Sequence, residues 1–167
     1  MAWLQRGLTP FLILLIGVWA GEAVAQEVRD RTDILRQLAP RADDAGFGAE
    51  RPSIDLQVQF ALGSANLTAA AKEQLDALAE AMASEALADQ RFLVAGHTDA
   101  TGSEELNLDL SFRRARSARA YLVDLHEIAP ARLAIVGYGE SRLKNPLNPS
   151  GAENRRVEVV VLGALLR

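Results

Sequence analysis

The feature that most constrains the fold is a short apolar run that leads through a polar loop into a long helical pattern. The run extends from Arg91 to Ala95, is bounded by turn signals, and has the length of an interior strand. It stops at Gly96, where the polar stretch from His97 to Arg116 begins. A polar, glycine-bounded loop between a buried strand and a helix start is a common place for a ligand site. This stretch is therefore the first candidate for function.

A strand and a helix are predicted ahead of this run. Residues 54–60 alternate strictly between apolar and polar, with Phe60 the last apolar position, which indicates a strand buried on one face. Thr68 is a suitable N-cap for the pattern that follows. From residue 69 to about 87 the apolar residues recur at helical spacing while the charges lie on other faces, so we expect a scaffold helix there.

The polar loop leads into a second predicted helix. Ser103 can cap it, and the acidic pair Glu104 and Glu105 suits the positive end of a helix dipole. Its predicted core stripe consists of Leu110, Ala118, Leu122 and Leu125. Residues 107, 111 and 114 form a neighbouring stripe that can face the loop from which the helix grows.

Two further strands complete the pattern, over residues 133–136 and 157–162, with Pro130 ending the second helix. The order is strand, helix, strand, helix, strand, strand, and each strand–helix–strand unit should be a right-handed crossover joining parallel strands. We therefore predict an α/β (α+β) two-layer sandwich, a β-α-β-α-β-β mixed sheet with two helices on one face. The long connection from Tyr138 to Arg155 carries few element signals, and such connections are usually functional or mobile.

The N-terminal residues 1–25 are typical of a cleaved secretory signal peptide. Arg6 supplies the positive start, an apolar stretch follows, and Ala23-Val24-Ala25 forms a small-residue cleavage site. The alternative is an uncleaved anchor, but a membrane span needs about 20 apolar residues and Glu22 interrupts this stretch early. We expect a linker over 26–52 that allows one short docked helix at Ile34, Leu35 and Leu38, a domain over 53–163, and a tail over 164–167.

Composition narrows the functions that remain. A net charge of −4 gives no basic footprint for nucleic acid. Because the chain has no cysteine, it offers neither a thiolate metal site nor an acylated N-terminal cysteine. The two histidines, His97 and His126, leave little material for a metal centre, and no Gly-x-Ser-x-Gly elbow accompanies Ser103. We expect a protein that is not an enzyme and has no metal and no cofactor.

Asp99 in the polar loop and Arg114 on the helix are the strongest pair of candidate site residues. An arginine fork matches a carboxylate bidentately, and charge-assisted contacts are the strong ones, so the two side chains together suit a small zwitterion. On spacing alone, an Asp–Arg bridge that merely ties the loop to the helix is equally compatible with the sequence.

Several motifs of the chain occur together in a characteristic order. They are Gly96-His97-Thr98-Asp99, Gly102-Ser103, Asn107, Leu110-Ser111, Arg114-Ala115, Gly137-Tyr138-Gly139-Glu140-Ser141 and Asn154-Arg155-Arg156-Val157. With these spacings the segment from about Ile54 to Leu162 resembles the OmpA-like C-terminal domain, a family that binds peptidoglycan without a covalent bond. One departure is visible: Arg142-Leu143-Lys144 stands where family members often have a proline, which leaves the conformation of that loop open.

The resemblance suggests roles for four residues, and a fifth, Phe60, is a candidate because it ends the predicted first strand. The ligand of the family is the diaminopimelate of the peptidoglycan stem peptide, with Asp99 taking its ammonium and Arg114 its carboxylate. Asn107 is expected to orient the ligand or a loop carbonyl. Arg155 is either a contact to the carboxylate or glycan, or a charged strand-edge residue. Phe60 either forms a wall of the pocket or belongs to the core.

The resulting prediction is a periplasmic, cell-envelope protein that binds peptidoglycan and contacts a membrane only indirectly. Whether it is associated with the outer membrane, or with an envelope protein partner, is left open by the sequence. The alternative is a periplasmic protein-interaction adaptor of the same fold with an idle pocket.

Overall fold

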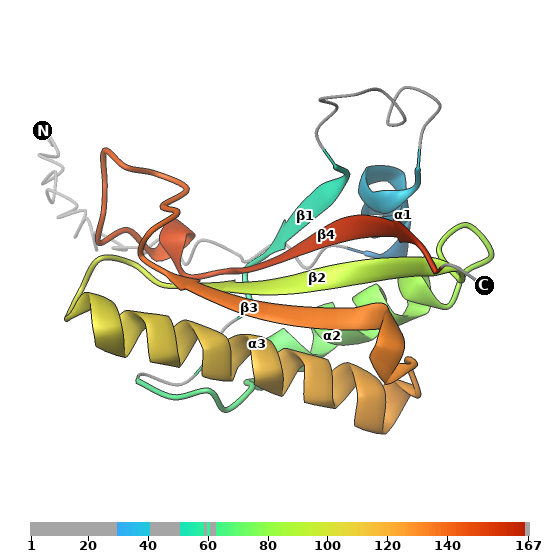
Figure 1. Ribbon diagram of the computed structural model, residues 1–167, viewed down its shortest axis with the longest axis horizontal. Coiled ribbons are helices and arrows are strands. Elements are labelled where there is room, and N and C mark those ends of the chain that lie inside the picture. Colours follow the sequence, from blue (N-terminus) through green and yellow to red (C-terminus); the bar gives the residue numbers. More distant parts are fainter. Residues whose placement is uncertain (1–29, 41–50, 59, 61–62, 166–167) are drawn as a thin grey trace, which may run out of the picture.

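Figure 1 shows the computed structural model, which describes residues 30–40, 51–58, 60 and 63–165. The predicted signal peptide and part of the predicted linker lie outside these residues. The described helices are α1 (Arg31–Leu38), α2 (Ala69–Met82) and α3 (Glu104–His126), with 3₁₀ turns η2 (Pro130–Arg132) and η3 (Ala152–Asn154), and the strands are β1 (Ser53–Leu56), β2 (Gln90–His97), β3 (Leu133–Gly139) and β4 (Val157–Ala164).

The four strands form one mixed sheet in the order β1-β4-β2-β3. β2 and β3 are parallel neighbours joined through α3, as the crossover rule predicts. β4 pairs antiparallel with both β1 and β2, so it separates two strands that run in the same direction. Helices α2 and α3 lie on the same side of the sheet (Figure 1). The structure confirms the predicted fold class, a mixed two-layer α/β sandwich.

The first strand is shorter than its alternating pattern predicts. β1 ends at Leu56, which pairs with Val157, the first residue of β4. Beyond that point no residue of β4 is available to continue the ladder. Val58 stays buried, and Phe60 forms an isolated antiparallel bridge with Leu67 instead of ending the strand. The chain therefore turns away from the sheet and carries Phe60 towards the N-terminal half of α3.

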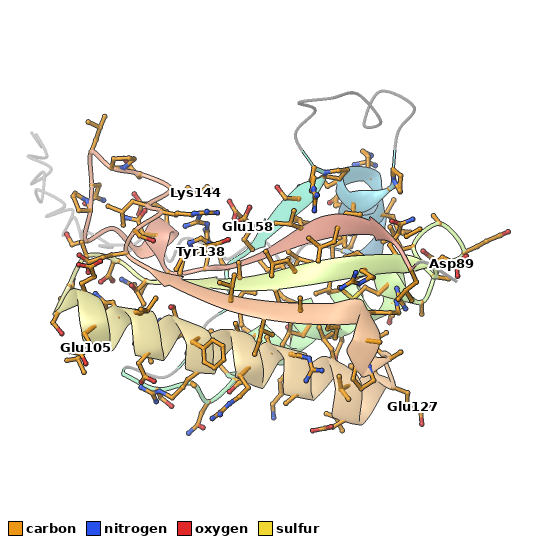
Figure 2. The ribbon with its side chains drawn as sticks, viewed as in Figure 1. Asp89, Glu105, Glu127, Tyr138, Lys144 and Glu158 are labelled. Atoms are coloured by element: carbon orange, nitrogen blue, oxygen red, sulfur yellow. The ribbon has the colours of Figure 1, made fainter. Side chains whose placement is uncertain are left out.

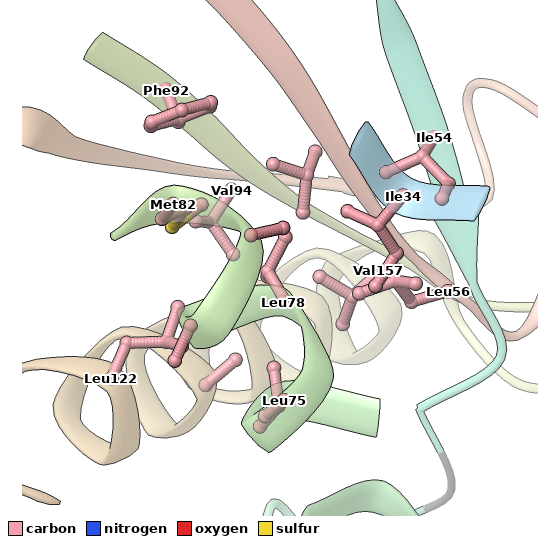
Figure 3. Packing of buried hydrophobic residues seen from close by; sticks show 14 of the residues in the cluster. Ile34, Ile54, Leu56, Leu75, Leu78, Met82, Phe92, Val94, Leu122 and Val157 are labelled. Atoms are coloured by element: carbon pink, nitrogen blue, oxygen red, sulfur yellow. The ribbon is translucent and has the colours of Figure 1, made fainter. Parts of the chain in front are cut away.

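The hydrophobic core lies between the sheet and the helices, where Leu75, Leu78 and Met82 of α2 pack against Phe92 and Val94 of β2 (Figure 3). These side chains are fully buried. Burying a side chain of this size contributes about 1.5–3 kcal/mol. The helix–sheet layer is therefore held mainly by apolar contact.

Helix α1 adds a third helix to this core. Asp30 caps it by accepting a hydrogen bond from the Asp33 backbone N–H at 2.9 Å, and Ile34 and Leu38 are fully buried. The helix packs against α2 and β1. The short docked helix that the sequence allowed within the predicted linker therefore forms, and it joins the two predicted helices at the core.

The ends of both long helices differ from the prediction. α2 stops at Met82 rather than near residue 87, because the Arg132 guanidinium donates to the carbonyls of Met82 and Leu87 at 2.9 and 2.7 Å and satisfies the helix end. In α3, the predicted core residue Leu125 is 66% exposed. The chain reverses at Glu127 with a φ of 55°, and Ile128 takes the buried position instead.

Candidate ligand-binding site

A cavity of about 520 Å³ lies where the loop after β2, the start of α3 and the loop between β3 and β4 meet. Its lining residues come from segments far apart in sequence: Phe60, Gly63, Thr98, Asp99, Thr101, Asn107, Leu110, Arg114, Ser150 and Arg155. All five residues predicted to form the site line this cavity. The cavity also contains both signs of charge.

Two glycines bring α3 close enough to the sheet to place its polar stripe over this cavity. A Cβ atom at Gly96 would overlap the backbone carbonyl of Ser111, and one at Gly137 would overlap the backbone nitrogen of Phe112. Ser111 is fully buried, and its hydroxyl accepts from the Gly139 backbone N–H at 2.9 Å. The close contact fixes the height and rotation of α3, and with them the position of Arg114.

Asp99 is held in place by two donors. Its Oδ1 accepts from the Thr101 backbone N–H at 3.0 Å, and its Oδ2 accepts from Arg155 Nη1 at 2.7 Å. Burial acts to raise the pKa of the Asp99 carboxyl, but the hydrogen bonds from Arg155 and Thr101 outweigh it, and the pKa lies below its ordinary value. Asp99 is therefore a carboxylate at neutral pH.

Arg114 is anchored at one side and open at the other. Its Nε donates to the Ser64 carbonyl at 3.1 Å, and its guanidinium carbon lies 4.9 Å from the centre of the Phe60 ring. Within the described residues, no hydrogen bond from either Nη of Arg114 is recorded. Burial lowers the pKa of Arg114 and the charge of Arg155 lowers it further, yet a guanidinium stays protonated. The open Nη pair is available for a carboxylate.

The structure records no ion pair between Asp99 and Arg114 among the described residues. Asp99 is paired with Arg155, and Arg114 with a backbone carbonyl and an aromatic ring. A direct bridge between loop and helix, the structural alternative for this pair, is therefore absent from the described contacts. Arg155 carries the bridge to the loop instead.

Asn107 fixes the loop that bears Asp99. Its Nδ2 lies 3.2 Å from the Asp99 carbonyl, 3.2 Å from the Thr101 carbonyl and 2.6 Å from Glu140 Oε2. The residue is 5% exposed. Asn107 was predicted to orient either the ligand or a loop carbonyl, and its hydrogen bonds to the Asp99 and Thr101 carbonyls match the second role.

A buried asparagine organises the long connection between β3 and β4. Asn154 Nδ2 donates to the carbonyls of Asn148 and Pro149 at 2.8 and 3.1 Å, and its Oδ1 accepts from the Asn145 backbone N–H at 2.9 Å. The Pro149 carbonyl also accepts from the Ala100 backbone N–H at 2.9 Å. The connection is thereby tied to the loop of Asp99, and it carries Ser150 and Arg155 to the cavity.

The segment that departs from the family pattern is fixed to the sheet face away from α3, where Figure 2 places Tyr138, Lys144 and Glu158. Lys144 Nζ lies 2.8 Å from Asp55 Oδ2. The Arg142 guanidinium carbon lies 3.7 Å from the centre of the Tyr138 ring. Stacking and an ion pair hold this part of the loop without a proline.

Sequence reasoning missed several contributors to the site, among them Thr101, whose backbone N–H donates to Asp99. Ser64 supplies the carbonyl that positions Arg114, Glu140 binds Asn107, and Ser150 lines the cavity. Glu140 lies within the Gly-Tyr-Gly-Glu-Ser motif, and Ser150 lies in the long connection before Arg155. Both residues could therefore have been proposed from features that the sequence analysis had already identified. No sequence signal marks Ser64, because it acts through its backbone.

The residues considered for a metal site or a catalytic nucleophile, His97, His126 and Ser103, do not form a cluster. His97 Nε2 is 3.2 Å from Glu158 Oε2 at one end of the sheet, whereas His126 Nε2 is 2.7 Å from Asp76 Oδ1 at the far end of α3. Ser103 Oγ caps α3 by accepting from the Leu106 backbone N–H. Among the described residues there is no cluster of three or more metal-ligating side chains. Nor is any described helix long and apolar enough to cross a membrane.

The fold and the cavity together define a class of protein: an α/β sandwich module with a charged ligand cavity at the loop end of its sheet. The sequence model of the OmpA family matches residues 59–158. The chain belongs to the OmpA family.

Individual relatives agree with this assignment. The chain is 33% identical over 130 residues to the peptidoglycan-associated lipoprotein of Pseudomonas aeruginosa, covering 70% of this chain and 75% of that protein. It is 36% identical over 128 residues to the peptidoglycan-binding protein ArfA of Mycobacterium tuberculosis, where the match covers 70% of this chain but only 38% of ArfA. The crystal structure of the peptidoglycan-associated lipoprotein from Burkholderia pseudomallei superposes with a TM-score of 0.54 at 27% identity, covering 72% of this chain and 97% of that one.

Proposed function

We propose that this protein binds cell-wall peptidoglycan without a covalent bond, through the diaminopimelate of the stem peptide. Relatives similar to most of this chain carry peptidoglycan association or binding in their names. The observation that carries the proposal is that Asp99 and Arg114 line one cavity without forming a recorded ion pair with each other. Their opposite charges suit a ligand that carries an ammonium and a carboxylate on one carbon.

In this proposal Asp99 takes the ammonium and Arg114 takes the carboxylate. The open Nη pair of Arg114 has the geometry for a bidentate contact, and charge-assisted hydrogen bonds of this kind are about twice as strong as neutral ones. Phe60 keeps the guanidinium plane in place by stacking. Asn107 holds the loop of Asp99 through its carbonyls, and Arg155 reaches the carboxylate or the adjoining glycan.

We also propose a location and a mode of action. With residues 1–25 removed as a signal peptide, the protein is periplasmic, with the outer membrane reached only through partners. It acts by binding and not by catalysis, and it needs no cofactor or metal.

One observation favours the alternative function, an adaptor with an idle pocket. Asp99 already has an ion pair with Arg155 at 2.7 Å, so its charge is compensated in the absence of ligand. A pocket whose anion is compensated can persist as a purely structural feature. The two functions predict different behaviour of the same variants.

The test is co-sedimentation with purified sacculi, together with thermal unfolding. Asp99→Ala and Arg114→Ala each remove one partner of a desolvated charge contact, which typically costs about 2–5 kcal/mol, or roughly 30-fold or more in affinity. Arg116→Ala removes one exposed positive charge from the same helix, outside the cavity, and should bind as wild type does. If the two site variants sediment like wild type, or fail only because they unfold, the adaptor function replaces peptidoglycan binding.

A further inference from the structure

The cavity holds two guanidinium groups and one carboxylate. Arg114, Arg155 and Asp99 all line it, so these three groups leave one positive charge in excess when no ligand is bound. The two arginines are close enough for the charge of Arg155 to act on Arg114. A ligand carboxylate placed between them would relieve this repulsion, whereas a ligand with only an ammonium would not.

Both carboxylate oxygens of Asp99 already accept a hydrogen bond in the observed arrangement, and little of the residue is open to a ligand. One oxygen accepts from the Thr101 backbone and the other from Arg155, and the residue is only 8% exposed. A carboxylate oxygen can accept more than one hydrogen bond, but because so little of Asp99 is exposed, an incoming ammonium would meet the Arg155 guanidinium at the same oxygen. Thr101 cannot give way as easily, because its N–H belongs to the loop that Asn107 holds.

Of the two arginines, Arg155 is the one that can move. Its side chain is 47% exposed, against 12% for the Asp99 side chain with which it pairs. Its one recorded side-chain hydrogen bond to the described residues goes to Asp99. Arg114, in contrast, is held by the Ser64 carbonyl and by the Phe60 ring.

We propose that Arg155 is a displaceable counter-ion that couples the two charged ends of the ligand. In the free protein it neutralises Asp99. When the ligand ammonium takes its place, Arg155 turns to share the ligand carboxylate with Arg114. This inference rests on the proposed function, and it goes beyond it by assigning to Arg155 the selection of ligands that carry both charges.

A displaceable Arg155 gives the site a selectivity for doubly charged ligands that fixed contacts from Asp99 and Arg114 alone would not give. Lysine differs from diaminopimelate by lacking the carboxylate on the carbon that bears the ammonium. A lysine side chain would have to displace Arg155 and leave both guanidiniums without an anion. Discrimination by an unpaired charge is a general route to specificity. The site should therefore select the diaminopimelate type of stem peptide over the lysine type.

Calorimetric titration with two soluble stem peptides tests the proposal. The peptides are identical except for their third residue, which is either meso-diaminopimelate or lysine. Wild-type protein should prefer the diaminopimelate peptide by roughly 30-fold or more. In Arg155→Ala, Asp99 has no counter-ion to lose, so the lysine peptide should bind about tenfold tighter than it binds to wild type. The diaminopimelate peptide should bind this variant no tighter than wild type, because it loses the second guanidinium.

The opposite responses of the two peptides are the diagnostic result. Arg116→Ala, which removes one positive charge outside the cavity, should leave both affinities unchanged, and Arg155→Lys should keep a preference close to that of wild type. If Arg155→Ala weakens both peptides equally, or changes neither, Arg155 is not a displaceable counter-ion, and the proposed function stands without this device. If folded wild-type protein binds neither peptide, the proposed function and this inference fall together.

Discussion

Replacing Asn154 with alanine tests how the loops of the site are held together. The residue is fully buried and makes three hydrogen bonds, two to carbonyls and one from a backbone N–H, at 2.8–3.1 Å. At about 1 kcal/mol net for each bond, Asn154→Ala should destabilise the protein by about 3 kcal/mol. For a domain of this size that corresponds to a fall in Tm of roughly 10 °C.

The expected loss extends to binding. The Pro149 carbonyl that Asn154 holds also accepts from Ala100, the residue after Asp99, and the same loop carries Arg155. Asn154→Ala should therefore weaken sacculus binding even at temperatures where the protein is folded. The assay is differential scanning calorimetry together with co-sedimentation at 20 °C or below.

The matched control is Asn148→Ala, a substitution of the same residue type in the same loop. The Asn148 side chain is exposed and makes one long hydrogen bond, to Glu153 at 3.3 Å, so its loss should cost less than about 1 kcal/mol. Equal melting temperatures for the two variants would show that the buried amide of Asn154 is not what holds the loop.

Three further predictions concern other parts of the molecule. Arg132→Met should leave the buried Met82 carbonyl without its donor, while the Leu87 carbonyl keeps the Gln90 backbone N–H, and should cost about 1–3 kcal/mol in urea unfolding; a loss below about 1 kcal/mol would contradict this. Burial acts to raise the pKa of Asp55, but Lys144 and Arg156 outweigh it and hold the pKa below the ordinary 3.8. The ionised Asp55 therefore stabilises the fold at neutral pH, and this contribution is lost as pH falls through the pKa of the folded state. Asp55→Asn should lose less stability than wild type between about pH 5 and pH 2. Mass spectrometry of the exported protein should find Gln26 at its N-terminus, and intact protein retaining Met1 in the inner membrane would contradict the cleavage.

The sequence predicted the structure well where the stabilising contacts join residues close together in the chain. Thr68 and Ser103 cap their helices as expected, since capping depends on a side chain and a backbone N–H three residues away. The alternation that ends at Phe60 overstated β1, because the length of a strand depends on the partner, which lies a hundred residues further along. The short helix that the sequence allowed in the linker does form, and its two core residues are buried against partners from other elements.

The candidate site shows the same division. The five residues predicted for the site all line the cavity, together with others that were not predicted. The ion pair between Asp99 and Arg155 was not predicted. It depends on how the long connection before β4 folds back, and sequence spacing does not determine the conformation of a loop of this length. Ser64 acts through a carbonyl that every residue possesses, so its identity carries no signal.

The most direct test of the central claim is a titration of isotope-labelled protein with free meso-diaminopimelate, followed by backbone amide NMR. The free amino acid should cause saturable shifts in the Thr98–Gly102 loop and in the turn of α3 that bears Asn107, and Asp99→Ala should abolish them. A protein that sediments with sacculi yet shows no shifts in these residues, or shows them only on the sheet face of Tyr138 and Glu158, would contradict the assignment of this cavity as the peptidoglycan site.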